Sequence, residues 1–164
     1  MTTFVPKPGQ VDYTHAARAP VINCVVEHDG KILLVKRSRK LNLHPGVWNG
    51  VSGFLDDGKS PMEKAKEELL EEAGISPEQI ISMEEGKVFE VRDGAYGKTW
   101  VTHPVHVKVA TDAVKLDWEA EEYRWVAPAE IKGLALTPGF LNVLDQFFGK
   151  TAHLSSPRTR GSMP

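Results

Sequence analysis

A loop rich in glycine and aspartate runs directly into a helix signal near the middle of this chain, and this junction constrains the local structure most strongly. Ser60, Pro61 and Glu63 supply an N-cap, a proline suited to the first helical position and an acidic first turn. Gly74 predicts the end of the helix. We therefore expect a helix over residues 61–73 that is entered from an irregular loop.

Three carboxylates share one face of the expected helix. Glu68, Glu71 and Glu72 occupy positions i, i+3 and i+4, which brings their side chains within reach of one another. Such carboxylates repel one another unless a cation lies between them, and Mg²⁺ and Mn²⁺ prefer oxygen ligands of this kind. Because acidic helix faces are also common as solvated surfaces, the spacing alone leaves both interpretations open.

The segments on either side of the loop and helix predict a sheet. Two aliphatic runs, at residues 21–28 and 31–37, flank Asp29-Gly30, a pair suited to a tight turn, and so predict a hairpin. Further extended segments are expected at residues 47–52, 86–92, 98–110 and 123–126. A last amphipathic helix is expected over residues 139–149, with an apolar face made of Phe140, Leu141, Leu144, Phe147 and Phe148. Strands on both sides of an internal helix indicate a mixed α/β sandwich.

The composition fits one domain, since 41% of the 164 residues are hydrophobic and 26% are charged. We place this domain at residues 19–149, between an N-terminal extension at residues 1–18 and a flexible C-terminal tail at residues 150–164. The net charge of −2 gives no global attraction to nucleic acid or to an anionic membrane. The single cysteine, Cys24, excludes an intrachain disulfide and is expected to be buried. Without an apolar run of membrane-spanning length or a secretory signal, a cytoplasmic protein with no membrane partner is expected.

The loop and helix together resemble the Nudix box, whose pattern is Gly, five residues, Glu, seven residues, then Arg-Glu-apolar-any-Glu-Glu-any-Gly-apolar. The residues that match this pattern are Gly53, Glu68, Leu69, Glu71, Glu72, Gly74 and Ile75. The order of the flanking strands and of the last helix is also similar to that of the Nudix hydrolase superfamily. The resemblance implies a Nudix-type α/β/α sandwich with a mixed β-sheet.

Two positions depart from the box. Lys59 stands where the pattern has its first glutamate, and Glu67 stands where it has arginine. Because the signs are exchanged while the opposition of charge is kept, we expect a reversed Lys59–Glu67 ion pair that joins the loop to the helix. The alternatives are that neither residue matters, or that Glu67 beside Glu68 raises the carboxylate pKa, which would either favour extra metal binding at Glu67 or weaken the base at neutral pH.

The resemblance implies a metal-dependent hydrolase that cleaves a phosphoanhydride bond in a nucleoside diphosphate linked to another moiety. Glu68, Glu71 and Glu72 would hold Mg²⁺ or Mn²⁺, with the carbonyl of Gly53 as a further ligand. Water would attack phosphorus, with Glu68 as the favoured base. The implied partner is a small nucleotide or another diphosphate.

Accessory residues are expected on two further segments. Relatives often use an extra glutamate from a loop near the closing strand, and Glu121 and Glu122, in a run that also contains Glu119, are candidates as an accessory base or metal ligand. Arg37 could bind phosphate, because alternation along its strand directs only one of Lys36 and Arg37 inward. Trp48 could stack on a base, although packing in the core is the alternative. We expect Trp118 to pack as well.

Three other functions compete with hydrolysis. A non-catalytic Nudix-fold sensor of nucleotides would fit the exchange of Lys59 and Glu67. An enzyme like isopentenyl diphosphate isomerase would need a catalytic cysteine, and Cys24 is not placed in such a motif. A messenger RNA decapping role would need a basic tract for the RNA body, so nucleic acid is not the expected partner. Members of the superfamily are often homodimers, which the sequence of this chain does not decide.

Overall fold

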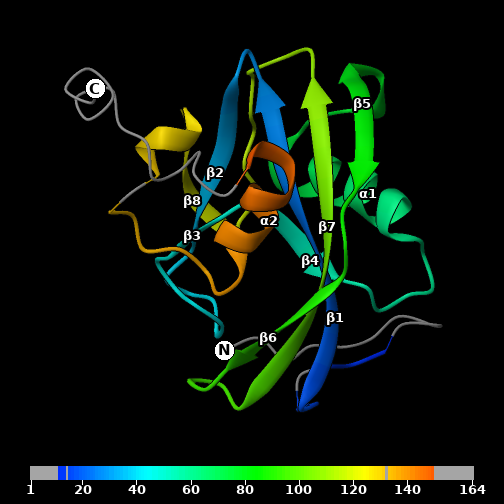
Figure 1. Ribbon diagram of the computed structural model, residues 1–164, viewed down its shortest axis with the longest axis vertical. Helices are drawn as coiled ribbons and strands as arrows, with labels where there is room; N and C mark the ends of the chain where they lie inside the picture. The colour runs from blue at the N-terminus through cyan, green and yellow to red at the C-terminus, as the bar shows by residue number, and fades with distance from the viewer. Residues whose placement is uncertain (1–10, 14, 132, 150–164) are drawn as a thin grey trace.

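A computed structural model describes residues 11–13, 15–131 and 133–149 of the chain (Figure 1). Its strands and α-helices follow in the order β1 (Arg18–His28), β2 (Lys31–Arg37), β3 (Trp48–Asn49), β4 (Val51–Phe54), α1 (Pro61–Ala73), β5 (Ile80–Glu85), β6 (Phe89–Asp93), β7 (Lys98–Val109), β8 (Ala120–Val126) and α2 (Phe140–Phe148). Short 3₁₀ helices at Pro77–Gln79 and Pro128–Glu130 precede β5 and follow β8.

The strands form one mixed sheet around a parallel central pair. β1 runs parallel to β7 from the pair Arg18–Thr99 to the pair Glu27–Lys108. β1 also pairs antiparallel with β2 and β4, while β8 extends the sheet beyond β2. β5 and β6 both pair antiparallel with β7. This arrangement puts β4, which leads into α1, next to the centre of the sheet.

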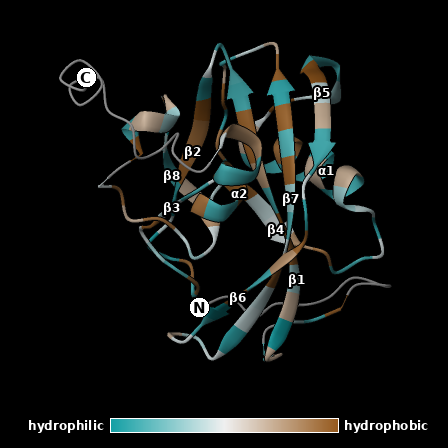
Figure 2. Ribbon diagram, in the orientation of Figure 1, coloured by the Kyte–Doolittle hydropathy of each residue, from teal (hydrophilic) through white to brown (hydrophobic). Residues whose placement is uncertain are grey.

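The two helices cover opposite faces of this sheet. Cys24 of β1 packs in a cluster with Leu69 of α1, whereas Val25 packs in a second cluster with Phe140 and Leu144 of α2. Neighbouring residues of a strand point to opposite faces, so α1 and α2 must lie on opposite sides, as Figure 1 shows. Figure 2 shows hydrophobic residues recurring along β2 and β7 between these layers. The expected α/β/α sandwich with a mixed sheet is therefore confirmed.

The helix α1 has the ends that the sequence predicts. The hydroxyl of Ser60 accepts a hydrogen bond from the backbone of Glu63, and the carboxylate of Glu63 accepts one from the backbone of Ser60. Gly74 adopts φ 67°, and its N–H donates to the carbonyl of Leu70. Because glycine adopts this left-handed conformation without strain, it ends the helix at Ala73.

Other predicted features differ from the structure. The edge strand β5 was not predicted, because only Ile80 and Met83 of its polar sequence pack against the core and no clear alternation results. The expected strand at residues 86–92 begins only at Phe89. On α2, Leu141 is exposed and Val143 is buried in its place, so the predicted apolar face was wrong at this position. Trp118 was expected to pack, but 67% of it is exposed.

Part of the expected N-terminal extension lies against the domain. Tyr13 stacks on Phe54, and the ammonium of Lys98 donates to the carbonyls of Tyr13 and Ala16 at 2.9 and 2.7 Å. The expected C-terminal tail, residues 150–164, is outside the described residues. Cys24 is fully buried, as predicted. Among the described residues, no helix is long and apolar enough to cross a membrane.

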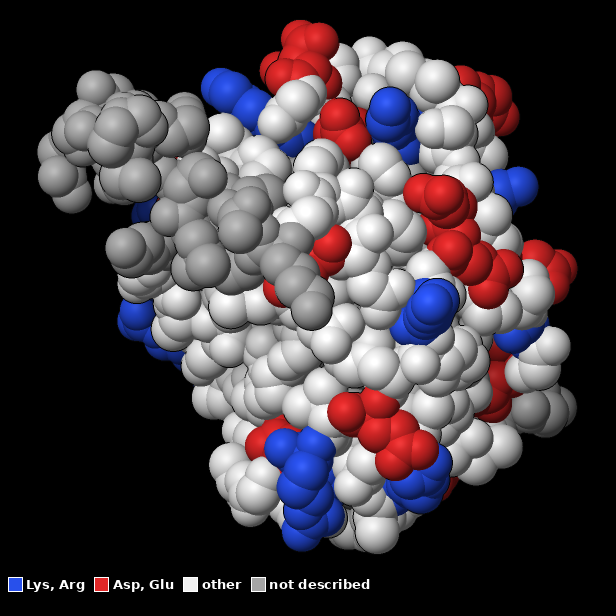
Figure 3. Space-filling view, in the orientation of Figure 1, with Lys and Arg blue, Asp and Glu red and all other residues white. Residues whose placement is uncertain are grey.

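The distribution of charged side chains on the surface indicates which kinds of partner the protein can bind. On the face shown in Figure 3, acidic and basic side chains occur in small mixed groups and not as one continuous basic area. A nucleic acid chain binds to proteins mainly through such basic areas. This face therefore gives no support to an RNA partner.

Candidate active site

The acidic face of α1 meets β4 at a glycine. A Cβ atom added to Gly53 would lie 2.8 Å from the carboxyl carbon of Glu68, closer than side chains tolerate. Only glycine therefore lets the carboxylate of Glu68 lie directly against the backbone of β4. The loop that follows β4 turns back into α1, so two residues that are distant in the sequence, Gly53 and Glu68, meet in one site.

The carboxylates of α1 lie close together at this glycine. Oxygen atoms of Glu67, Glu68 and Glu71 all lie within 4.8 Å of one another. Glu72 lies deeper, with only 8% of its surface exposed. The sequence predicted a group of Glu68, Glu71 and Glu72. In the structure, the close cluster contains Glu67 in place of Glu72, and Glu72 is buried beside it.

The electrostatics of these groups show a negative site that Lys64 and Arg37 compensate only in part. Burial, together with the charge of Glu71, raises the pKa of Glu68 to about 8. Burial and the charge of Glu68 raise the pKa of Glu72 well above its usual range. A divalent cation would reverse both effects, because it favours the ionised form of each carboxylate. An all-oxygen donor set beside a bare backbone fits a hard cation such as Mg²⁺ or Mn²⁺.

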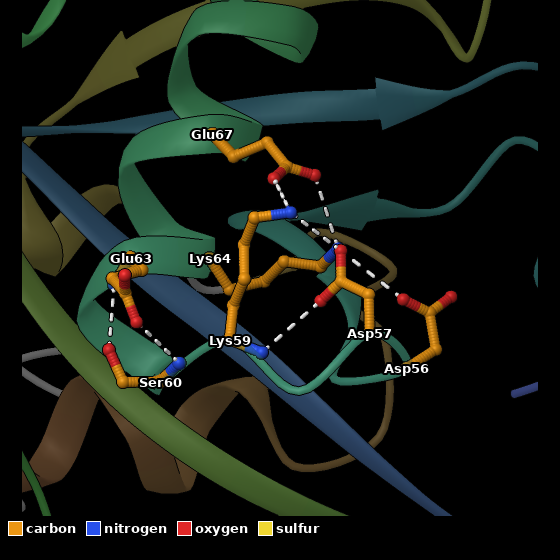
Figure 4. Close-up of polar contacts among 7 residues, drawn as sticks. All are labelled: Asp56, Asp57, Lys59, Ser60, Glu63, Lys64 and Glu67. Atoms are coloured by element: carbon orange, nitrogen blue, oxygen red, sulfur yellow. Dashed lines mark hydrogen bonds and ion pairs between the residues drawn. The ribbon is translucent and has the colours of Figure 1, made fainter. Parts of the chain in front are cut away.

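A second set of charged residues joins α1 to the loop that precedes it (Figure 4). The ammonium nitrogen of Lys59 lies 2.8 Å from Glu67 and 2.8 Å from Asp57. The ammonium nitrogen of Lys64 lies 3.2 Å from Glu67, 3.1 Å from Asp57 and 3.4 Å from Asp56. The two groups that the sequence analysis paired, Lys59 and Glu67, are thus in contact, but as part of a network of five residues. We name these residues the loop–helix network.

Within the loop–helix network, the pKa values of Asp57 and Glu67 are lowered, whereas those of Glu68 and Glu72 at the acidic face are raised. A hydrogen bond from Lys59 lowers the pKa of Asp57 to about 2. Although burial opposes the change, Lys59 and Lys64 hold the pKa of Glu67 below its usual range. Two lysines thus contact Glu67, although its charge still makes a contribution, smaller than those of burial and Glu71, to the raised pKa of Glu68.

Arg37 and Glu119 reach the same site from β2 and from the start of β8. Both line a pocket that also includes Gly53. The Nε atom of Arg37 donates to the carbonyl of Leu43 at 2.9 Å, and burial lowers the pKa of its guanidinium. Lys36 instead lies 3.9 Å from Glu121. Of the two basic residues at the strand end, Arg37 is the one that faces the pocket.

The loop glutamates favoured from the sequence do not face this pocket. Glu121 lies against Lys36 and Arg39, and Glu122 lies 3.2 Å from Arg124. Glu119 lines the pocket, and burial together with Asp117 raises the pKa of its carboxyl. Of these three glutamates, Glu119 is therefore the one that lines the pocket, from the turn before β8.

Trp48 packs in the core, which leaves little of its ring accessible to a ligand. Only 6% of it is exposed, and it belongs to the cluster around Phe140. The guanidinium of Arg124 covers its ring at 4.8 Å. The expectation that Trp48 binds substrate was wrong, and the alternative of packing is correct. The backbone of Trp48 pairs with Ala135 and Leu136, which are far from it in the sequence.

The pocket continues from Arg37 into a part that combines apolar walls and polar groups. Its apolar wall includes Leu43, Phe54, Trp100 and Pro138. Its polar part is a chain of hydrogen bonds in which Asn23 donates to Asn49 at 3.0 Å, Thr137 donates to Asn49 at 2.6 Å, and Asn49 donates to Ser52 at 3.0 Å. Such a combination is typical of sites that bind small molecules. The sequence analysis had identified none of these polar residues.

One end of the pocket is formed by a histidine with an unusual backbone. His44 has φ 48°, a conformation that L-residues rarely adopt. Its Nε2 atom lies 2.7 Å from the buried carboxylate of Asp93, which also accepts a hydrogen bond from the indole of Trp100 at 3.0 Å. The hydroxyl of Tyr96 accepts from the backbone of His44 at 2.8 Å. Several contacts thus hold His44 at the pocket wall in a strained conformation.

Comparisons with known proteins agree with this fold. A family model described as NUDIX domain matches residues 16–147. A Mycobacterium tuberculosis protein provisionally named 8-oxo-dGTP diphosphatase 3 is 32% identical over 121 residues, which is 68% of this chain. The chain spans only 52% of the length of that relative.

Two solved structures share the fold. A NUDIX hydrolase from Nitrosomonas europaea superposes with a TM-score of 0.65 at 22% identity, covering 79% of this chain and 88% of that structure. The NUDIX domain of Shewanella oneidensis NrtR in complex with ADP ribose superposes with a TM-score of 0.64 at 19% identity, covering 85% of this chain and 92% of that structure.

Proposed function

The chain belongs to the Nudix family, and from this membership we propose that it hydrolyses a phosphoanhydride bond in a nucleoside diphosphate derivative with the help of Mg²⁺ or Mn²⁺. One observation carries the proposal. Glu68, which lies against Gly53, and the buried Glu72 have raised pKa values and, among the described residues, no ion pair to a lysine or arginine, although lysines neutralise Glu67 on the same helix. Carboxylates kept in this condition are typical of sites for a cationic ligand.

We assign the metal to Glu68, Glu71 and Glu72, with the carbonyl of Gly53 as a further ligand. When bound there, Mg²⁺ or Mn²⁺ supplies Lewis-acid polarisation of a phosphoryl oxygen and neutralises the charge of the diphosphate. The carboxylate of Glu68 would accept a proton from the attacking water, since it lies against Gly53, which lines the pocket. Glu119 is the accessory carboxylate on the facing segment.

Arg37 binds the diphosphate in this proposal. Its guanidinium lies at the pocket wall between the acidic site and the apolar part, and its Nε atom is already fixed by Leu43. The remaining guanidinium N–H groups can donate to phosphate oxygens. Partial burial strengthens such a contact, because fewer water molecules compete for it.

The rest of the pocket supports a nucleotide as the substrate. Trp100 and Phe54 offer apolar surface for a base or ribose, and the amides of Asn23 and Asn49 offer hydrogen bonds. His44 is our candidate for fixing the bound group at the far end. The names of the relatives, which mention 8-oxo-dGTP and ADP ribose, point to the same class of compound.

The test is hydrolysis of a panel of nucleoside triphosphates, nucleotide sugars, ADP-ribose and dinucleoside polyphosphates with Mg²⁺ or Mn²⁺. Turnover that is lost in Glu68→Gln but kept in Glu121→Gln supports the proposal, since both variants remove one carboxylate from the same molecule. His44→Ala should raise KM about tenfold and change kcat less. Metal-dependent binding of a nucleotide without turnover would favour the sensor, and no binding at all would exclude both functions.

The alternative of an isomerase with a catalytic cysteine receives no support. Cys24 is fully buried, and burial raises the pKa of its thiol well above the usual range. A thiol in this condition is neither accessible nor reactive. A hydrolytic site remains the better interpretation of the acidic cluster.

A further inference from the structure

Lys64 is a buried lysine in the helix that carries the acidic cluster of Glu67, Glu68 and Glu71. Only 4% of it is exposed, and its ammonium nitrogen lies within 3.4 Å of carboxylate oxygens from Asp56, Asp57 and Glu67. Lysine is rarely buried to this degree unless its charge is paired. Figure 4 shows the side chain reaching from α1 under the loop to all three carboxylates.

Lys59 shares two of these carboxylates but stands in a different environment. Its side chain is 43% exposed, so water can replace its contacts with Asp57 and Glu67. No water can do the same for Lys64 without entering the protein. The two lysines of the loop–helix network are therefore not equivalent, and the buried one determines which charges its neighbours can carry.

The position of Lys64 links this network to the acidic site. It lies one helical turn before Glu68 and holds Asp56 and Asp57, which belong to the loop that leads from Gly53 to α1. That loop must keep its place for the backbone of Gly53 to lie against the Glu68 carboxylate. A contact that fixes the loop on the helix therefore also fixes the two components of the site relative to each other.

We propose that Lys64 is a positioning residue of the active site, that it supplies the cation which the Nudix box places at position 67, and that it forces position 67 to be acidic. This inference rests on the proposed function for its catalytic consequence. The partner that decides the sign of residue 67 is then Lys64 and not Lys59.

Restoring the family pattern at both positions should therefore not restore the contact. In Lys59→Glu/Glu67→Arg, an isolated ion pair would simply be reversed and would remain intact. Here the carboxylate introduced at position 59 would face Asp57, which now lies 2.8 Å from Lys59. The guanidinium introduced at position 67 would face Lys64, which now lies 3.2 Å from Glu67. Each reversed charge would thus meet a like charge that has not been reversed, so the consensus pair should fail.

The experiment compares two ways of rescuing Glu67→Arg. Lys64→Met/Glu67→Arg lets the arginine take the place of the buried ammonium opposite Asp56 and Asp57, whereas Lys59→Glu/Glu67→Arg does not. We would measure urea unfolding without metal, the dissociation constant for Mn²⁺ alone, and kcat and KM on the best substrate. Lys66→Met is the matched control, because Lys66 is an exposed lysine of the same helix.

The expected results separate positioning from a general effect on stability. Lys64→Met should weaken Mn²⁺ binding about tenfold and lower kcat about 10- to 100-fold with KM within about twofold, whereas Lys66→Met should leave each quantity within about twofold. Lys64→Arg, which keeps the charge, should retain Mn²⁺ affinity within about threefold. Lys64→Met/Glu67→Arg should exceed both of its single variants in stability and Mn²⁺ affinity, which is a positive coupling in a double-mutant cycle.

Two results would overturn the proposal. One is rescue of Glu67→Arg by Lys59→Glu to the level of the native protein, which would show an isolated pair. The other is native Mn²⁺ affinity and kcat in a folded Lys64→Met protein. If Lys64→Met does not fold, the comparison of Glu67→Arg with Lys59→Glu/Glu67→Arg still decides, because it leaves residue 64 unchanged. The unfolding and Mn²⁺ measurements need no substrate, so failure of the hydrolase proposal would be seen separately as absent turnover.

Discussion

The helix α1 carries two sets of carboxylates that differ in whether lysines neutralise them. On the loop side, Glu67 contacts two lysines, and its pKa lies below the usual range. On the pocket side, burial raises the pKa of Glu68 and Glu72, and the negative charges of their neighbours raise it further. The two sets are separated by less than one helical turn. The chain therefore does not lack lysines for neutralising carboxylates but places them on one side only.

This difference separates structural charges from functional ones. A neutralised carboxylate holds the loop on the helix, and its energy is realised in the protein without any ligand. A carboxylate left without a cation destabilises the protein in the absence of a ligand, and binding of the ligand relieves that cost. Glu68 and Glu72 should thus lower the stability of the metal-free protein while supporting function. Glu67, on the loop side, should support both stability and function.

The largest expected effect is at Glu72. Glu72→Gln should lower kcat about 10³-fold, because a proposed metal ligand is lost, and should raise the midpoint of thermal unfolding of the metal-free protein at pH 8, because a buried carboxyl group whose ionised form is disfavoured by burial is removed. Glu67→Gln should lower that midpoint, since it removes a partner of two lysines. Shifts of the midpoint in the same direction in both variants would contradict the difference between the two sets of carboxylates.

The second prediction uses pH in the metal-free protein. Because the folded-state pKa of Glu68 is about 8 against an ordinary value of 4.5, the folded protein binds more protons than the unfolded chain between these values. The free energy of unfolding should therefore fall as pH rises from 5 to 8. A fall on the order of 2 kcal/mol is expected after allowing for solvent at this partly exposed group.

Saturating Mg²⁺ should flatten this dependence, because a bound cation favours the ionised carboxylates in the folded state. Urea unfolding at pH 5, 6.5 and 8, with Mg²⁺ and with a chelator, measures both slopes. Glu68→Gln should reduce the slope of the metal-free protein. A free energy of unfolding that rises across this range without metal would show that the pocket carboxylates are compensated by other groups.

The third prediction extends the comparison to the segment that faces α1. Glu119 lines the pocket with a raised pKa, whereas Glu121 lies against Lys36 and Arg39. Glu119→Gln should lower kcat about 10- to 100-fold. Glu121→Gln should change kcat less than about twofold and leave the dissociation constant for Mn²⁺ unchanged. Steady-state kinetics on both variants checks this, and a larger loss in Glu121→Gln would return the accessory role to the glutamate favoured from the sequence.

What the sequence could predict was local. Ser60 and Gly74 fix the ends of α1 through neighbouring backbone groups, and Asp29-Gly30 fixes the hairpin turn, so the elements around the site follow from short segments. The family pattern added Gly53 and Glu68, although only the fold shows that the carboxylate lies against this glycine.

The residues that could not be predicted depend on contacts between distant segments. Lys64 reads as one more polar residue of an amphipathic helix, and only the path of the loop over it makes it buried. The choice between Glu119 and Glu121 depends on the pairing of β8 with β2, where Arg37 lies opposite Ala120. Trp48 is buried by the segment before α2. Neither periodicity nor a motif contains this information.

The smallest expected effect concerns the loop side at low pH. A hydrogen bond from Lys59 lowers the pKa of Asp57 to about 2, so its contribution to stability is present above the unfolded-state pKa of about 3.9 and is lost as pH falls toward 2. Asp57→Asn should lower the free energy of unfolding by less than about 1 kcal/mol at pH 7, and the difference from the native protein should vanish near pH 2.

Asp29→Asn is the control, because Asp29 is 90% exposed and asparagine accepts the same turn conformation. Urea unfolding at pH 7, 4 and 2.5 measures both variants. The two sides of α1 then predict opposite limbs of the pH profile: the pocket carboxylates weaken the metal-free protein as pH rises above 4.5, and the loop carboxylates weaken it as pH falls below about 4. An Asp57→Asn protein that loses the alkaline limb instead would mean that the loop charges act on the pocket itself, and the two sets would no longer be separate.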